Sequence, residues 1–160
     1  MTTLGGETGK GAIPWSVAVR YTTDLPPNSK DCALLVGTRL DRDLVDEGEV
    51  VTANVRVANR TDAVVPSPLV RVGVPAGLEP VTKGLDRMVK EQTIAAYEVR
   101  PREVTLYFRD LAANADTTLP IELTAAIPGR FEGPATSAYL YYTDDLRAWA
   151  APLRVTVTAR

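Results

Sequence analysis

The sequence predicts an all-β protein, an antiparallel β-sandwich of about nine strands with one short helix at its edge. Two patterns support this prediction. Apolar and polar residues alternate along most of the chain, as they do in strands that bury one face and expose the other. Turn-forming Gly, Pro, Asn and Asp residues separate these segments at regular spacing, which is typical of a sandwich. A stretch of helical period, about residues 81–92, interrupts the pattern.

The clearest strand lies at residues 50–58. Val51, Ala53, Val55 and Val57 alternate there with polar residues, so we expect one face in the core and the other in water. The other expected strands show the same alternation, although in some of them it is less regular. The nine expected strands are 15–21, 33–40, 50–58, 69–74, 97–100, 104–108, 119–126, 135–142 and 153–159.

The segment 81–92 has the spacing of an amphipathic helix. Leu85 and Met88 belong to an apolar stripe, with charged residues on the other faces. Pro80 stands where a first-turn proline is tolerated. Gly84 costs about 1 kcal/mol relative to alanine in a helix interior. We therefore expect a short helix that is held by docking onto the sheet.

Composition excludes several classes of function. The chain contains no histidine, which removes Ser-His-Asp and Cys-His catalysis and His-based metal sites. Lys+Arg 18 against Asp+Glu 20 gives a net charge of −2, so no strong field attracts nucleic acid or an anionic membrane. Cys32, the single cysteine, is expected to be a small buried hydrophobe. We predict no catalytic residue, no cofactor and no metal site.

Three short stretches match chemical sites only in part. The glycine-rich residues 5–11 lack the first glycine and the Ser or Thr of a phosphate loop, and a flexible terminus is the alternative. The acidic residues between 41 and 49 suit calcium but fit no EF-hand spacing, so exposed turns are favoured. Asp144 and Asp145 suit a glycosidic carboxylate pair, but adjacent residues point apart, so a solvated turn is favoured. The acidic residues are Asp41, Asp43, Asp46, Glu47 and Glu49.

Two further patterns leave alternatives open. Asn59 begins an N-glycan acceptor motif in an expected surface turn. The aromatic run 139–142 suits a sugar-stacking platform. The favoured alternative places Tyr139 and Tyr141 on one face and Leu140 and Tyr142 on the other, with one of the two faces in the core.

The helix carries the candidate binding site that we take most seriously. Lys83, Arg87 and Lys90 stand at i, i+4 and i+7, so they share one exposed face that suits an acidic partner groove. The alternative is a solvated face, partly neutralised by i,i+4 pairs with Asp86 and Glu91.

The order of elements over about residues 48–152 resembles the C-terminal receptor-binding domain of the alpha-macroglobulin and complement thioester protein family. A proline, small residue, glycine turn precedes the exposed helix, and a Tyr-Tyr strand precedes the last hairpin. No single motif is specific, and their order carries the resemblance. The matching segments are 72–80, 84–89, 97–99, 104–108, 119–123 and 134–142.

The resemblance implies a division of the chain. Residues 9–21 resemble the last strand of the family's preceding CUB-like domain. Residues 1–26 would thus hold that strand and a linker, and 27–160 the sandwich. The parent would be an exported protease-trapping protein, extracellular or in the periplasm or cell envelope. The sandwich would be no enzyme, and its partners would be other parent domains and a receptor or cell-surface protein, without nucleic acid or membrane insertion.

The resemblance also concerns the helix. The family's receptor site uses two lysines four residues apart. Alignment on Pro80 puts Thr82 and Asp86 at those positions, whereas Lys83 and Arg87 keep the spacing one residue later. A bacterial-type homologue without such a receptor fits equally well. The alternative function is an accessory adhesion or carbohydrate-binding sandwich of an extracellular protein.

Overall fold

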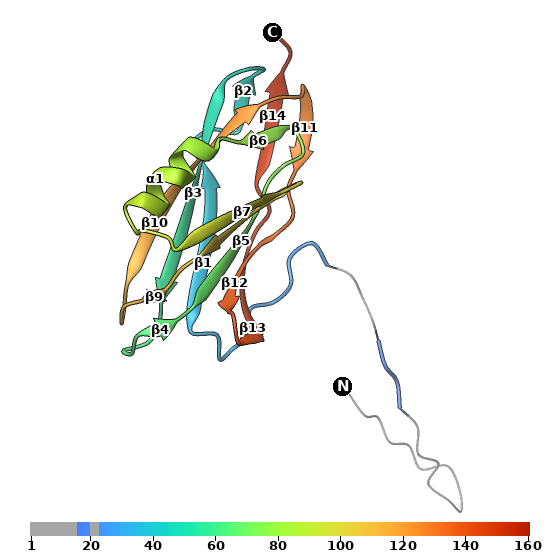
Figure 1. Ribbon diagram of the computed structural model, residues 1–160. Coiled ribbons are helices and arrows are strands. Elements are labelled where there is room, and N and C mark those ends of the chain that lie inside the picture. The colour runs from blue at the N-terminus through green and yellow to red at the C-terminus, as the bar shows by residue number, and fades with distance from the viewer. Residues whose placement is uncertain (1–15, 20–22) are drawn as a thin grey trace, which may run out of the picture.

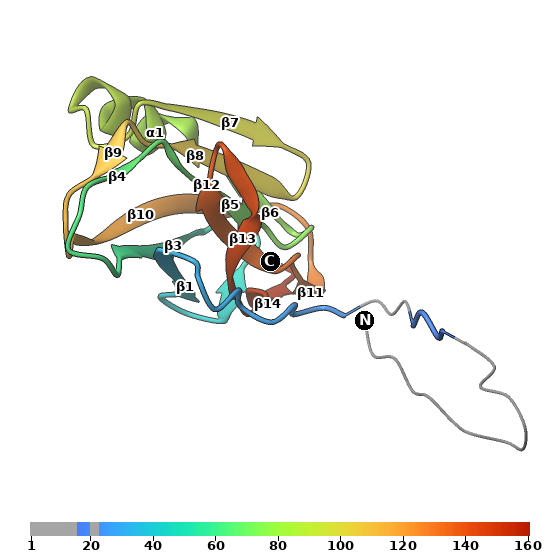
Figure 2. The same cartoon turned by 90° about the horizontal axis from the view of Figure 1, so that it is seen from below.

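Two large β-sheets face each other in the computed structural model, which describes residues 16–19 and 23–160 (Figure 1). The view from below shows the two layers with the helix beside one of them (Figure 2). The four-stranded sheet has the order β1 (Leu34–Leu40), β3 (Val50–Asn59), β10 (Asp116–Ala125) and β6 (Leu78–Pro80). The five-stranded sheet has the order β13 (Thr143–Ala150), β12 (Thr136–Leu140), β5 (Pro68–Gly73), β8 (Glu103–Tyr107) and β7 (Ala96–Arg100). The predicted all-β sandwich is confirmed.

Two small sheets complete the sandwich. One has the order β11 (Gly129–Glu132), β14 (Arg154–Thr158) and β2 (Leu44–Asp46), and the other pairs β4 (Val65–Pro66) with β9 (Asp110–Leu111). Strands β14 and β2 run parallel, whereas the remaining strand pairs of the described chain are antiparallel.

The core lies between the two large sheets. Strand β3 pairs with β1 on one side and β10 on the other, and the buried face predicted for it is confirmed. Burying one valine side chain stabilises the fold by about 1.5–3 kcal/mol. Cys32 is buried in the same core, as the sequence predicts. The fully buried residues on β3 are Val51, Ala53, Val55 and Val57, and those facing them from β5 and β8 include Val70, Val104 and Leu106.

Helix α1 (Thr82–Lys90) lies beside the sandwich and contacts β10 and β7 (Figure 1). It spans nine residues within the predicted range 81–92. Leu85 and Met88 are 1% and 5% exposed, so the apolar stripe predicted from the helical period docks onto the sheets. No helix in the described part of the chain is long and apolar enough to cross a membrane.

The helix ends differ from the prediction. Pro80 ends strand β6, and Val81 is the N-cap, so Pro80 is not in the first turn. The backbone N–H of Val81 donates to the carbonyl of Glu122 on β10, which ties the helix start to the sheet. At the other end Gln92 takes a left-handed conformation, φ 60°, which is a common way to stop a helix.

The described residues hold fourteen strands where the sequence predicts nine. Five of the additional strands have only two to four residues, which is too short for alternation to show. The predicted strand 135–142 ends at Leu140, and β13 follows after a tight turn. The predicted strand 15–21 falls partly outside the described residues. Its described part, 16–19, is exposed and forms no strand.

The segment 23–29, named here the strap, covers the outer edge of β13. The backbone N–H of Ser29 donates to the carbonyl of Arg147 at 2.8 Å, and the N–H of Arg147 donates to the Ser29 hydroxyl at 3.0 Å. The N–H of Trp149 donates to the side-chain carbonyl of Asn28 at 2.6 Å. The strap thereby satisfies backbone groups that an edge strand would otherwise leave open.

Candidate partner-binding surface

The basic helix face consists of Lys83, Arg87 and Lys90, all three exposed on α1. The structure brings these three predicted residues together along one surface groove of about 440 Å³. Gly84 also lines the groove, and a Cβ atom added there would meet nothing within 4 Å. Gly84 therefore contributes no side chain that would fill the groove.

The three cations of the basic helix face form no ion pair with any described residue. The predicted i,i+4 pairs with Asp86 and Glu91 are therefore wrong. Arg87 and Lys90 stand in the last helical turn, where positive charge interacts favourably with the helix dipole. The helix dipole stabilises these two positive charges, which no ion pair among the described residues neutralises.

Two carboxylates also line the groove. Asp86 comes from the helix and Glu122 from the neighbouring strand β10. Three cations against two carboxylates leave one net positive charge. The groove therefore has a small excess of positive charge, which favours contact with acidic groups.

Asp86 has a different partner from the one predicted. The hydroxyl of Tyr97 on β7 donates a hydrogen bond to Asp86 Oδ1 at 2.6 Å. This bond raises the pKa of the Tyr97 phenol above its ordinary value, and burial acts in the same direction. The bond joins the helix to β7 at the edge of the five-stranded sheet.

The acidic residues between 41 and 49 are separated in the fold. Asp41 accepts a hydrogen bond from the Thr52 N–H at 3.0 Å, and Glu49 pairs with Arg42 at 3.0 Å. Within the described chain, no group of three acidic or thiol side chains is placed to hold a metal ion. These carboxylates act as separate turn and strand contacts.

The two acidic residues after the tyrosine run lie at the start of β13, both exposed. Asp144 pairs with Arg147 at 3.5 Å, and the backbone carbonyl of Asp145 accepts a bond from the Ser29 hydroxyl at 3.3 Å. Both residues are exposed, as predicted, but they belong to strand β13 and not to a turn, so the predicted turn is wrong. The glycine-rich residues 5–11 lie outside the described part of the chain.

Asn59 is 3% exposed, so the glycan acceptor in a surface turn is wrong for the folded domain. Its amide nitrogen donates to the carbonyls of Ala63, Leu111 and Ala112 at 2.7, 3.2 and 2.9 Å. Its side-chain oxygen accepts bonds from the N–H and hydroxyl of Thr61 at 2.9 and 2.8 Å. Every hydrogen-bonding atom of this amide is used inside the protein.

The tyrosine run is also placed differently. Tyr142 is 83% exposed because the strand ends before it, at Leu140, so the predicted alternation through residue 142 is wrong. Tyr139 is half-buried on the outer side of the five-stranded sheet, and the Arg147 guanidinium lies 4.3 Å from its ring centre. Tyr141 and Tyr142 form an exposed edge-to-face pair at the turn.

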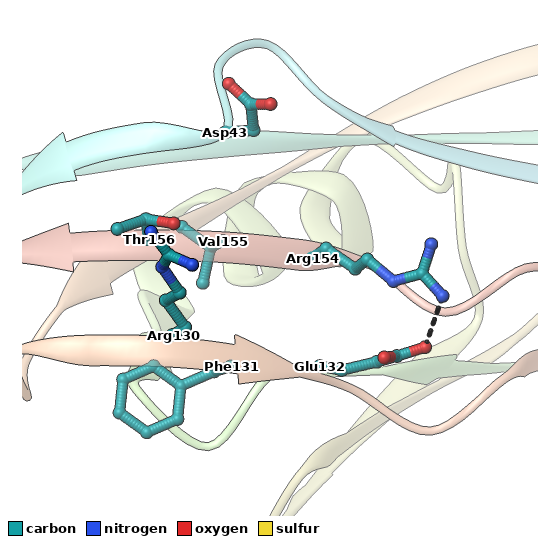
Figure 3. Close-up of a pocket in the computed structure, with 7 residues that line it drawn as sticks. All are labelled: Asp43, Arg130, Phe131, Glu132, Arg154, Val155 and Thr156. Atoms are coloured by element: carbon teal, nitrogen blue, oxygen red, sulfur yellow. Dashed lines mark hydrogen bonds and ion pairs between the residues drawn. The ribbon is translucent and has the colours of Figure 1, made fainter.

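A second hollow, which sequence patterns did not indicate, lies on the small sheet of β11, β14 and β2 (Figure 3). It has a volume of about 310 Å³. Arg154 and Glu132 are paired across it at 2.9 Å, and Arg130 points toward Thr156 while Phe131 turns away (Figure 3). The Glu132 carboxylate keeps the pKa of Arg154 raised. Two cations and two carboxylates line the hollow, together with the Thr156 hydroxyl.

The fold and its surface define a class of protein, a β-sandwich domain with a basic edge helix. The sequence model described as the MG10 domain of bacterial alpha-2-macroglobulin matches residues 29–145. The chain therefore belongs to the bacterial alpha-2-macroglobulin family, as an MG10 domain. No curated protein matches the sequence.

Solved structures agree on the fold. Salmonella alpha-2-macroglobulin reacted with methylamine matches with a TM-score of 0.66 and 20% identity, over 82% of this chain and 10% of that chain. Native Escherichia coli alpha-2-macroglobulin, from domain MG7 to the C-terminus, matches with a TM-score of 0.66 and 18% identity, over 82% of this chain and 24% of that chain. The native conformation of the E. coli protein seen by cryo-EM matches with a TM-score of 0.65 and 18% identity, over 92% of this chain and 10% of that chain. The chain thus spans a small part of these proteins.

Proposed function

We propose that this chain is a non-catalytic interaction domain of an exported alpha-2-macroglobulin-type protease inhibitor, a protease trap much larger than the chain. The family match over residues 29–145 is the main support. The matched Salmonella protein is about ten times longer than the aligned part, which fits a domain that works as a part of a larger machine. The parent would lie outside the cytoplasm, in the periplasm, the cell envelope or the medium.

The basic helix face is the proposed contact surface. The single observation that carries this proposal is the alignment of three exposed cations, without ion pairs among the described residues, along one groove. Its partner would be an acidic surface, either another domain of the parent or a receptor-type protein. Charge complementarity of this kind mainly raises the association rate and selects partners.

The domain would become exposed when protease cleavage rearranges the parent. One supporting observation is that the fold matches both a native E. coli alpha-2-macroglobulin, with a TM-score of 0.65, and a trypsin-activated one, with 0.63. A domain with the same fold in both states can move as a rigid unit and present a preformed surface. The receptor-binding role would then need no folding of the helix.

Charge reversal of two cations tests the surface. The double variant Lys83→Glu, Arg87→Glu should keep the fold, with Tm changed by no more than about 2 °C, because both side chains are exposed and unpaired within the described structure. Binding of immobilised poly-L-glutamate at low salt should be lost. The matched control is Arg39→Glu, Arg60→Glu, two exposed cations elsewhere, which changes net charge equally and should retain binding.

The outcome separates the possible roles of these side chains. If the helix variant unfolds, Lys83 and Arg87 are structural and the binding proposal fails. If both double variants lose poly-L-glutamate equally, only net charge matters and the surface is not specific. The same helix variant in the full-length parent, assayed for trapping of trypsin, then tells whether the surface serves the inhibitor.

The sequence encoded next to this chain offers an independent test of the family role. A thioester or bait-like region upstream supports the protease trap. A hydrolase domain or a tandem row of similar sandwiches there contradicts it, and favours an accessory adhesion module.

A further inference from the structure

The outer face of the five-stranded sheet carries a group of polar and aromatic side chains that the proposed function does not use. It is named here the outer sheet face, and it surrounds a hollow of about 310 Å³. Strands β12, β5, β8 and β7 lie side by side beneath it (Figure 1). Its central residues are Arg71, Glu98, Arg100, Glu103, Tyr107 and Tyr139.

Strand register places these residues in rows across the sheet. Arg71 is opposite Thr105, which is in turn opposite Glu98. Glu103 is opposite Arg100. Because side chains alternate between the two sides of a sheet, all of these residues point away from the core. Four strands at about 4.8 Å spacing give a surface about 14 Å across.

The charges of the outer sheet face neutralise one another. Arg71 pairs with Glu103 at 2.6 Å, and Arg100 pairs with Glu98 at 3.0 Å. Burial raises the pKa of Tyr107, and the Glu98 carboxylate, to which the Tyr107 hydroxyl donates at 3.4 Å, acts in the same direction. The face therefore presents many oriented donors and acceptors but little net charge.

This arrangement selects one class of ligand by its chemistry. A strongly charged partner would have to break the internal ion pairs to gain contacts. An apolar partner would take these ionised groups out of water, and desolvation is costly even for paired charges. A neutral ligand rich in hydroxyl groups can accept from the arginines and donate to the carboxylates, and such charge-assisted hydrogen bonds are stronger than neutral ones.

An aromatic platform lies at the rim of the same hollow. Tyr141 lines it and is 61% exposed. Tyr142 contacts the Tyr141 ring edge-to-face, with ring centres 5.1 Å apart. Aromatic rings with a polar tip suit ligands that have both apolar C–H faces and hydroxyl groups, which is the surface of a pyranose ring.

We propose that the outer sheet face binds a neutral glycan of β-linked hexopyranoses. Such chains are extended, as the strands beneath the outer sheet face are. Hydroxyl groups of the sugar bond to Glu98, Arg100 and Tyr107, and one ring stacks on Tyr141. The site lies on a different element from the basic helix face, so it stands or falls independently of the protease-trap function.

Titration of the full chain with oligosaccharides, followed by NMR amide shifts, tests this site. Chitohexaose or cellohexaose should shift amides of β7, β8 and the turn at Tyr141. Maltohexaose, which is α-linked and curved, should shift them at least tenfold less at equal concentration. Tyr141→Ala and Glu98→Gln should each weaken binding roughly tenfold, the effect of one aromatic contact or one hydrogen bond to a charged group.

Two controls keep the test decisive. Glu122→Gln makes the same change as Glu98→Gln but lies at the helix groove, so it should leave sugar binding unchanged. Circular dichroism and Tm must show that each variant is folded. No shift with either β-linked sugar, equal shifts with maltohexaose, or sugar binding that survives both Tyr141→Ala and Glu98→Gln would overturn the proposal.

Discussion

The Tyr97 hydroxyl donates a hydrogen bond to the Asp86 carboxylate at 2.6 Å, and this bond connects strand β7 to the exposed side of helix α1. It gives Asp86 a partner outside the helix. Lys90, which stands four residues after Asp86, has no ion pair within the described structure. This contact therefore adds to the apolar docking of the helix, and it gives Asp86 a partner other than Lys90.

Titration should reveal this bond at high pH. Because the neutral phenol is favoured in the fold, the pKa of Tyr97 is raised above the ordinary 10.0. The bond's contribution to stability is complete below pH 10 and is lost as pH rises through the folded-state pKa. Tyrosinate absorbance should therefore show a late component, to which Tyr107 also contributes. Tyr97→Phe should reduce this component by one tyrosine, and Asp86→Asn should move the Tyr97 part of it to lower pH. Glu91→Gln, on the same helix, should leave this component in place.

Gly84 should be replaceable with a gain in stability. Alanine at a helix interior is favoured over glycine by about 0.5–1 kcal/mol, partly through the unfolded chain, and the added Cβ meets nothing within 4 Å. Gly84→Ala should raise the free energy of unfolding by that amount in urea denaturation.

The matched substitution Gly73→Ala should have the opposite sign. A Cβ atom there would lie 1.9 Å from the Pro134 carbonyl oxygen, so the backbone must move. Equal effects of the two substitutions would mean that the packing around β5 is looser than the structure shows.

Asn59 should be a stability residue. Asn59→Ala removes the donor for three backbone carbonyls and the acceptor for Thr61. We expect a loss of at least about 2 kcal/mol, since each buried group left unsatisfied costs about 1–3 kcal/mol. Urea denaturation measures it, with Asn54→Ala, a half-buried position on the same strand, as the smaller control. A loss below 0.5 kcal/mol would contradict the buried network.

The strap should protect the edge of β13. In the variant Asn28→Ala, Ser29→Ala, the amides of Arg147 and Trp149 lose their side-chain acceptors. Hydrogen exchange at these two amides should become faster, while the amides of β3 in the core stay protected. Thr23→Ala, which removes only the two bonds between Thr23 and Leu25 within the strap, should leave the exchange of β13 unchanged. Unchanged exchange in the double variant would mean that the strap does not hold this edge.

The alternation of apolar and polar residues predicted the long strands well, because one face of each packs in the core and the other faces outward. On β3 the predicted apolar residues are fully buried. Short strands such as β4 and β9 have two residues each, so their pairing depends on tertiary contacts that no local pattern records. Strand β13 begins with four exposed residues, so its first half shows no alternation of apolar and polar residues that would predict a strand.

In the candidate site too, local patterns were predictable from the sequence and tertiary contacts were not. Helical spacing alone places Lys83, Arg87 and Lys90 on one face, and they do line one groove. Spacing does not reveal that Tyr97 on β7, 11 residues further along the chain, donates a hydrogen bond to Asp86. It also does not reveal that Asn59, in an apparently exposed turn, donates hydrogen bonds to the backbone of Leu111 and Ala112, more than fifty positions further along the chain.

Lysine labelling in the full-length parent tests the central claim most directly. Lys83 and Lys90 on α1 would be acetylated by a water-soluble reagent before and after trypsin cleavage, with exposed Lys30 as the internal reference. A domain whose basic helix face contacts the parent and is released on activation predicts slow labelling of both lysines before cleavage and fast labelling after it. Equal labelling of Lys83 and Lys90 in the two states would contradict the claim.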